Sequence, residues 1–547
     1  MHVKLQPLKP QPFSRQTCLP LVIFDTLVKI IMAKQKQTDP PPLFSVALVS
    51  LGCPKNLIDS EKMLGLLTED NIAVTPDHEQ ADAIVINTCG FLEASKIESL
   101  EVIREAIALK QKATKAGRTK RVIVVGCLVQ RHKTQLLEEV PEIDALVGVF
   151  DRQQIVNAVR RPSDLIPKAP RGSVVVGHRS RNRLSKTLCG VADRSQVNAI
   201  ELTPITIFIN KLTKATIGKG YTESDRARLR LTPRHYAYLR ISEGCNQGCT
   251  FCTIPSIRGR MRSKPLNAIL AEARELFNDG TIELNLIGQD TTSYGSDIGD
   301  TGGLSGVLRA LDKLASKHSK GRWIRLMYAY PSRFTDEMIK TLADCQNVVK
   351  YIDMPLQHIN DEILHAMRRR VTRKQIETLL DKLRQWVPGI ALRTTFITGF
   401  PGETTAHHKE LLKFVQDFGF ENLGVFEFSP EPGTPAARGI GIPPMIAAQR
   451  KEELMLAQQQ IVLQKNQAMI GQTIQVLIDN VNPKKKNALA RHAGQAPDVD
   501  SCVYLARCTA PLPSPGEILN VKIENYDNYD LIARPTTIRL PFAGTSR

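Results

Sequence analysis

Short apolar runs alternate with amphipathic stretches from residue 43 to about residue 160. Apolar runs rich in β-branched residues cover Phe44–Leu51, Ala83–Asn87 and Arg121–Gly126, and a helical pattern follows each, at 59–68, 93–112 and 130–139. Strands that are apolar throughout and separated by helices are typical of a parallel sheet buried on both faces. The pattern therefore predicts an α/β domain with a parallel sheet over 43–160.

The same alternation returns over 229–467. Strand patterns lie around residue 240 and at 283–287, 323–328, 349–353, 392–398 and 423–428, with helical patterns between them. This predicts a series of βα units. A long helix at 445–469 then leads to short alternating strands at 473–481, 501–506 and 517–523, and another is predicted at 531–532. We expect a small β-barrel over 468–547.

Two stretches, 1–42 and 161–228, carry no sustained period. Residues 1–42 are rich in proline, and their apolar run from 19 to 31 is interrupted by Asp25 and Lys29. That run is too short and too charged to span a membrane, and no signal-peptide cleavage site follows it. We interpret 1–42 as an N-terminal extension, with Met32 as an alternative start. Residues 161–228 read as a linker or insertion outside the packed core, 172–222 in particular.

The net charge of +18 invites a nucleic-acid-binding interpretation, but its distribution argues against it. Residues 1–42 carry a net charge of +4, and residues 160–230 hold fifteen Lys and Arg against five acids, a net charge of +10. Residues 470–547 hold nine Lys and Arg against seven acids. A dedicated RNA-binding domain usually has a stronger basic footprint, so the charge says little about the partner of the folded domains.

Three cysteines with C-x₃-C-x₂-C spacing lie on one short loop: Cys245, Cys249 and Cys252. Such a loop can supply three thiolates to a cubane iron–sulfur cluster and leave one iron open for another ligand. A zinc site is the alternative, but zinc motifs usually close with a fourth Cys or His at a matching spacing. His358 and His365 lie much further along the chain. The spacing favours a [4Fe–4S] cluster with an open iron.

Three more cysteines, Cys53, Cys89 and Cys127, each follow one of the predicted strands of the first domain. Because ligands bind at the carboxyl ends of parallel strands, the three thiols should converge on one rim of the sheet. Any one of them could be an ordinary buried cysteine, but all three occupy the same repeated position. The pattern favours a second cluster with an open iron. With eleven cysteines and no export signal, the chain should belong to a reducing, cytoplasmic compartment.

Two such triads in one chain resemble the radical SAM methylthiotransferase family. Four stretches resemble its RimO-like branch, which modifies a ribosomal protein, more than its MiaB-like branch, which modifies tRNA adenosine. They are 52–61 with Pro-Lys after Cys53, 87–99 with Gly-Phe after Cys89, 231–239, and 354–360. The resemblance covers about 43–160 and 229–542.

The resemblance implies an α/β fold of three parts. They are an N-terminal parallel αβ domain, a partial (β/α)6 radical SAM barrel and a C-terminal small β-barrel (TRAM-like). The implied reaction inserts sulfur into the β-carbon C–H bond of an aspartate in ribosomal protein S12 and methylates it, giving 3-methylthioaspartate. It needs two [4Fe–4S] clusters, S-adenosyl-L-methionine (SAM), and an electron donor such as flavodoxin. The substrate would be the ribosomal protein or the ribosome, without a membrane partner.

Four residues at predicted strand ends are candidates for the SAM pocket: Gln289, Asp290, Gly399 and Glu403. Each could equally be a turn glycine or a helix cap, so their assignment rests on the resemblance. Two alternative functions remain open: a tRNA adenosine methylthiotransferase, and a non-catalytic ribosome- or RNA-binding iron–sulfur protein.

Overall fold

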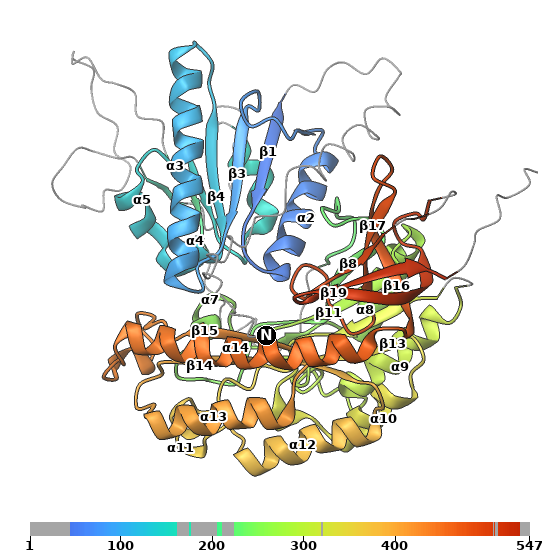
Figure 1. Ribbon diagram of the computed structural model, residues 1–547. Helices are drawn as coiled ribbons and strands as arrows, with labels where there is room; N and C mark the ends of the chain where they lie inside the picture. The colour runs from blue at the N-terminus through green and yellow to red at the C-terminus, as the bar shows by residue number, and fades with distance from the viewer. Residues whose placement is uncertain are drawn as a thin grey trace, which may run out of the picture.

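The computed structural model describes residues 44–160, 174–176, 205–209, 224–318, 321–506, 508 and 512–536. These form a first α/β domain, a second βα domain and a small closed barrel, in the order in which the chain runs (Figure 1). The expectations for 1–42 lie outside the described residues. None of the described helices is long and apolar enough to cross a membrane.

The first domain is a seven-stranded sheet in the order β2-β1-β3-β4-β5-β7-β6, parallel except for β6. Its strands are β1 (Ser45–Ser50), β2 (Ala73–Val74), β3 (Ala83–Thr88), β4 (Arg121–Gly126), β5 (Ala145–Val147), β6 (Val174–Val176) and β7 (Ile205–Phe208). Its helices are α2 (Pro54–Glu69), α3 (Glu93–Lys115), α4 (Cys127–His132), α5 (Leu136–Glu139) and α6 (Ile155–Val159). Every residue of β3 and β4 is buried, as expected for strands covered on both faces.

One expectation was wrong here. Residues 205–208 lie within the stretch that we interpreted as an insertion outside the core, yet β7 pairs with β5 and forms part of this sheet. Ile207 and Phe208 are 7% and 6% exposed and join the two hydrophobic clusters on either side of it. A four-residue strand is too short to produce a visible period, which is why the sequence did not reveal it.

The second domain is an open six-stranded sheet, in which β8 and β15 form the two edges and every neighbouring pair is parallel. Its strands are β8 (Tyr236–Arg240), β11 (Glu283–Ile287), β12 (Trp323–Leu326), β13 (Val348–Asp353), β14 (Ala391–Thr398) and β15 (Asn422–Glu427). This confirms the partial barrel. A separate pair, β9 (Ser242–Glu243) and β10 (Arg262–Ser263), flanks the loop that carries Cys245, Cys249 and Cys252. This loop also contains the short helix α7 (Ile254–Ile257).

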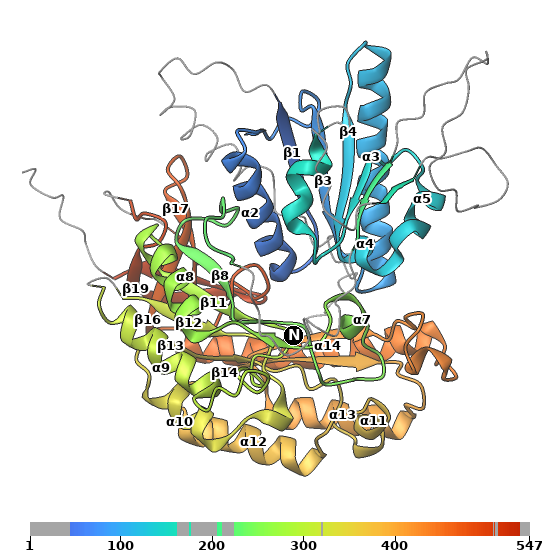
Figure 2. The same ribbon diagram turned by 180° about the vertical axis from the view of Figure 1, so that it is seen from behind.

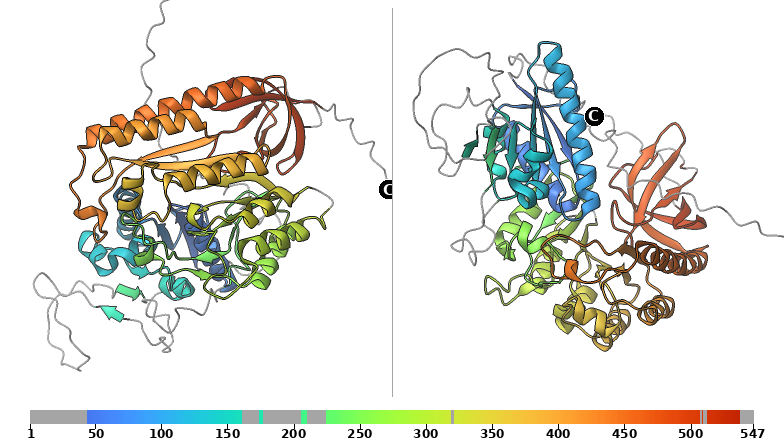
Figure 3. Two further views of the ribbon diagram at one scale, coloured as in Figure 1. Left: turned by 90° about the horizontal axis from the view of Figure 1, so that it is seen from below. Right: turned by 90° about the vertical axis from the view of Figure 1, so that its left-hand side faces the viewer.

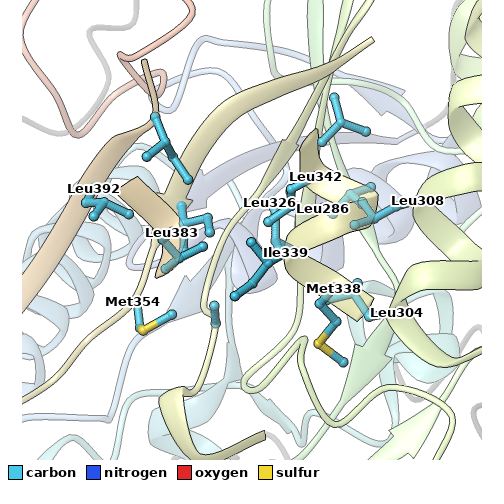
Figure 4. Packing of buried hydrophobic residues seen from close by; sticks show 14 of the residues in the cluster. Leu286, Leu304, Leu308, Leu326, Met338, Ile339, Leu342, Met354, Leu383 and Leu392 are labelled. Atoms are coloured by element: carbon cyan, nitrogen blue, oxygen red, sulfur yellow. The ribbon is translucent and has the colours of Figure 1, made fainter. Parts of the chain in front are cut away.

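Helices cover the outer face of this sheet: α8 (Leu266–Asn278), α9 (Gly303–Ala315), α10 (Asp336–Asp344), α11 (Asp361–Ala366), α12 (Arg373–Trp386) and α13 (Thr405–Phe418). The largest hydrophobic cluster lies between sheet and helices. Figure 4 shows Leu286 and Leu326 of the strands close to Leu308 of α9 and Leu342 of α10. Because this core holds the strands in place, their carboxyl ends form a fixed rim.

The long helix α14 (Pro444–Met469) runs beside β15 and leads into the closed barrel. Its strands are β16 (Thr473–Asn482), β17 (Asn487–His492), β18 (Val503–Leu505), β19 (Ile518–Asp527) and β20 (Asp530–Pro535). The sequence indicated the other four strands of the barrel but not β17, which directly follows the turn after β16. The first domain lies above the six-stranded sheet, and the closed barrel sits beside one end of it (Figures 2 and 3).

Candidate active site

The first triad, called here the auxiliary triad, consists of Cys53, Cys89 and Cys127. These cysteines directly follow, or lie close after, the ends of β1, β3 and β4, which are neighbours in the sheet. Gly52 has a φ of +86°, and a Cβ at that position would come within 2.8 Å of the Cβ of Cys89. Only glycine allows the two strand ends to approach this closely. The predicted convergence on one rim is therefore what the fold produces.

The auxiliary triad has one open side. Cys53 is exposed, whereas Cys89 and Cys127 are buried. Burial raises the pKa of Cys127 to about 12, although the positive charge of Arg258 opposes this. Cys53 and Cys89 are close enough to Cys127 to raise its pKa further. Binding to iron removes the proton from such a thiol, so a cluster fits this set of donors, with its open side toward Cys53.

The second triad, Cys245, Cys249 and Cys252, lies on the loop between β9 and α7 and is called here the SAM triad. Gly244 precedes it with a φ of +82°, and a Cβ there would lie 2.2 Å from the carbonyl oxygen of Arg260. The loop is held by hydrogen bonds from Cys245 N–H to Gly259 O, 3.1 Å, and from Cys252 N–H to Cys249 O, 3.2 Å. Burial raises the pKa of Cys245 to about 11 and that of Cys252 to about 12.

Within the part of the chain that the structure describes, no three His, Cys, Asp or Glu side chains could together hold one metal ion. A zinc ion needs its donors gathered around one centre, whereas a cubane places each thiolate on a different iron.

The four candidate SAM residues lie in two groups. Gln289 accepts a hydrogen bond from Gly244 N–H at 2.8 Å, and Asp290 accepts one from Gln247 at 2.5 Å, so both contact the loop of the SAM triad. Gly399 and Glu403 lie at the end of β14. There the Glu403 carboxylate accepts from Gly399 N–H and lies 3.3 Å from Arg450 of α14.

Packing explains Gly399 without a ligand. A Cβ on Gly399 would lie 2.5 Å from the Cβ of Ala447 in α14, so glycine lets that helix approach the strand end. One oxygen of Glu403, Oε1, is buried with no hydrogen-bond partner in the described structure. Asp290, by contrast, also accepts from Thr292 and Ser293, at 2.7 Å and 2.6 Å. Of the four, Gln289 and Asp290 contact the loop of the SAM triad, and the charge of Asp290 raises the pKa of Cys245.

Arg258, on the same loop, connects the two triads, and no pattern in the sequence indicates it. Its Nη2 lies 3.3 Å from Cys127 Sγ, and its Nη1 lies 2.7 Å from Asp59 of α2 and 3.3 Å from Glu243. Burial opposes ionisation of Asp59, but Arg152, Arg258 and Arg240 together lower its pKa to about 2. The first domain and the SAM-triad loop are thus joined by buried, paired charges, with a cation against the auxiliary triad.

Lys55 was also missed, although it stands two residues after Cys53. It is 6% exposed, and its Nζ lies 3.0 Å from the centre of the Tyr328 ring, at the end of β12. Burial lowers its pKa to about 8. Across the described residues its ammonium makes no ion pair, because the nearby carboxylates of Glu243 and Asp353 are bound to arginines. The motif Gly-Cys-Pro-Lys was the signal that could have identified it.

At the SAM triad, Arg369 and Tyr330 surround Cys249. Nη1 of Arg369 lies 3.7 Å from Cys249 Sγ, and the Tyr330 hydroxyl lies 3.9 Å from the same sulfur. The guanidinium stacks over the Tyr330 ring at 3.9 Å. Each triad therefore has one arginine in contact with a thiol.

The sequence matches three family descriptions: Uncharacterized protein family UPF0004 over 45–148, the radical SAM superfamily over 239–415 and the TRAM domain over 470–535. "Ribosomal protein uS12 methylthiotransferase RimO" of Desulforamulus reducens is 40% identical over 493 residues, which cover 89% of this chain and 98% of the relative. The protein of the same name from Geobacter sulfurreducens is 39% identical, covering 89% and 97%. These relatives match the chain through all three domains.

Among solved structures, the radical SAM methyltransferase TsrM from Kitasatospora setae has a TM-score of 0.46 at 15% identity, covering 72% of this chain and 73% of that one. The cobalamin-dependent radical SAM enzyme OxsB has a TM-score of 0.44 at 13% identity, covering 76% and 56%.

Proposed function

Because the chain belongs to the RimO family of ribosomal protein uS12 methylthiotransferases, we propose that it modifies an aspartate of uS12. Sulfur is inserted into the β-carbon C–H bond and methylated, giving 3-methylthioaspartate. The chain is an enzyme of the radical SAM class, and its ribosomal substrate would place it in the cytoplasm.

We assign one [4Fe–4S] cluster to each triad, with SAM beside the SAM triad near Gln289, Asp290, Gly399 and Glu403. When bound, these groups supply the electron and the adenosyl radical that activate the C–H bond, the sulfur, and the methyl group. The chain's own residues must bring the target carbon between the triads and keep water out. The thiols, loop glycines and buried arginines are fixed in the fold, so this arrangement exists before substrate binds.

The observation that carries the proposal is the contact of Arg258 with Cys127. It brings the loop of the SAM triad against the rim of the auxiliary triad, so one substrate carbon can lie near both. A protein in which the clusters were only structural would not need the two triads to lie against one contact between domains.

Lys55 supports an acidic target over adenosine. It lies next to exposed Cys53 and extends from the first domain to Tyr328 of the second. A buried ammonium is unfavourable unless anions lie beside it, and the thiolate of Cys53 exerts the largest favourable charge effect on Lys55. The side chain of an aspartate would add a further anion beside this ammonium, whereas the neutral base of an adenosine would not.

The test is a direct substrate comparison with the reconstituted enzyme. We expect SAM-dependent methylthiolation of a uS12 peptide that contains the target aspartate, and none of a tRNA anticodon stem-loop, by mass spectrometry. Modification of the stem-loop alone would favour the MiaB-like alternative. No cleavage of SAM by the reduced enzyme would favour a non-catalytic iron–sulfur protein.

A further inference from the structure

A basic surface lies directly beside the SAM triad. The segment that runs from the turn after α11 into the start of α12 reads Arg-Arg-Arg-Val-Thr-Arg-Lys over 368–374, five cations without an acid. Arg368, Arg370 and Lys374 are exposed. In the described structure none of these three makes an ion pair, whereas Arg373 pairs with Glu377 and Glu410. We call Arg368, Arg370 and Lys374 the 368–374 surface.

Arg369, which lies between Arg368 and Arg370, points inward. Arg369 is 7% exposed, and its guanidinium contacts Cys249 Sγ at 3.7 Å and the Tyr330 ring at 3.9 Å. The exposed cations of Arg368 and Arg370 are therefore the direct neighbours in sequence of a residue that contacts a thiol of the SAM triad. At this point Arg369 alone lies between the thiol of Cys249 and the exposed cations.

The turn is firmly held. Arg369 N–H donates to Leu364 O at 2.8 Å, and Val371 N–H donates to Arg369 O at 2.8 Å. Thr372 then caps α12 in a capping box with Gln375. The cations are thus displayed from a rigid backbone, which reduces the conformational entropy lost when a partner docks.

A groove adjoins these cations. It has a volume of about 390 Å³ and lies between the start of α10 and the first turns of α12. Its lining includes Phe334, Arg370, Lys374 and Lys382. Lys382 pairs with Asp336, which also lines the groove, so the unpaired positive charge is that of Arg370 and Lys374. A groove lined by unpaired cations is complementary in charge to an acidic surface of another protein.

We propose that the 368–374 surface is the docking site of an acidic, one-electron donor protein that reduces the cluster of the SAM triad. The donor gives up one electron, which the cluster accepts on passing from its oxidised to its reduced state, and no bond is made or broken in the docked complex. The proposal rests on the proposed function only in that the SAM triad binds a cluster. It does not depend on the identity of the methylthiolated substrate.

Electron transfer favours this assignment over ribosomal RNA, which would also be attracted to cations. Electron-transfer complexes are small, short-lived and steered by charge, and they must bring the donor close to the acceptor. The 368–374 surface meets that requirement through Arg369. An RNA-binding role would not require contact with Cys249.

The test reverses the charge and separates docking from cluster chemistry. The variant is Arg368→Glu/Arg370→Glu/Lys374→Glu, which leaves Arg369 in place. The control is Lys484→Glu/Lys485→Glu/Lys486→Glu, in the turn between β16 and β17, where three exposed lysines undergo the same change of charge. Bleaching of the cluster is followed by stopped flow after mixing the holoenzyme with photoreduced flavodoxin, or with dithionite, at low and at high salt.

We expect the flavodoxin-driven rate at low salt to fall about tenfold or more in the 368–374 variant, and the difference to shrink at high salt. The dithionite-driven rate should not change, and the control should reduce like the wild type. The milder Arg368→Gln/Arg370→Gln/Lys374→Gln variant should give an intermediate rate. Equal flavodoxin rates in all proteins would overturn the proposal, and so would a dithionite rate that falls as far as the flavodoxin rate. Unchanged reduction with loss of ribosome modification would instead assign the surface to the substrate.

Discussion

The guanidinium of Arg258 and the thiol of Cys127 lie 3.3 Å apart, although the two residues are 131 positions apart in the chain. Arg258 belongs to the loop of the SAM triad, and Cys127 to the auxiliary triad. A single cation thus links the two halves of the proposed active site. It is 3% exposed, so its charge acts with little screening by solvent.

The first prediction concerns this cation. Arg258→Met should shift the reduction potential of the auxiliary cluster to a more negative value, because an added electron loses a neighbouring positive charge. It should also lower the free energy of unfolding by about 3 kcal/mol or more, since Asp59 and Glu243 lose a buried partner. Redox titration followed by electron paramagnetic resonance measures the first effect.

Arg258→Lys retains the charge and should restore part of the potential but little of the stability, because lysine cannot form the same forked contacts. Arg260→Met, at an exposed position two residues further on, is the matched control. A potential that is the same in Arg258→Met and Arg260→Met would refute the electrostatic link.

The second prediction separates the two triads. Cys249→Ala should abolish formation of 5′-deoxyadenosine, whereas Cys89→Ala should still cleave SAM without forming methylthio product. Iron should fall from about eight atoms per chain to about four when all three auxiliary cysteines are replaced by alanine. Iron analysis and quantification of both products check this. Normal product from Cys89→Ala would mean that the sulfur comes from elsewhere.

The third prediction concerns recognition of the target by Lys55. Lys55→Met should raise the KM for the uS12 peptide about tenfold to a hundredfold, the value of a lost charged hydrogen bond, without reducing substrate-independent cleavage of SAM. A peptide with asparagine at the target position should bind the wild type and Lys55→Met with equal affinity. Equal discrimination between the two peptides by both enzymes would exclude Lys55 from binding the carboxylate.

The fourth prediction tests β7 as part of the first domain. Phe208→Ala removes a ring that is 6% exposed and should destabilise this domain by about 3 kcal/mol. Ile97→Ala, at a site in α3 that is 52% exposed, should have little effect. Denaturant unfolding of the two variants measures the difference. If both unfold like the wild type, β7 contributes no stability to the sheet.

The sequence revealed features with a strong local pattern and missed those that depend on contacts between distant segments. Strands such as β3 and β4 are uniformly apolar, so their existence and the convergence of Cys89 and Cys127 could be predicted. The contact of Arg258 with Cys127 could not, because an arginine in a loop has no periodic signal. The four residues of β7 were too few to form one.

In the closed barrel, the number of charged residues does not give the charge of the outer surface. The nearly neutral total of its residues suggested weak affinity for RNA, but the structure uses several of its acids internally. Asp498 accepts hydrogen bonds from Tyr236 and Tyr238 of β8, and Asp500 accepts from Tyr351 of β13. Their charges face the second domain, so the total does not describe the outer surface. The assignment of a protein substrate therefore rests on the family and on Lys55.

Whether the chain methylthiolates uS12 is measured most directly in cells. A strain lacking the gene, and the same strain carrying it, are compared by mass spectrometry of both ribosomal proteins and tRNA. We predict that the methylthio group on the aspartate of uS12 disappears in the deletion strain and returns with the gene, while methylthiolated adenosine in tRNA stays constant. Loss of the tRNA modification with unchanged uS12 would show that the chain acts on tRNA and not on uS12.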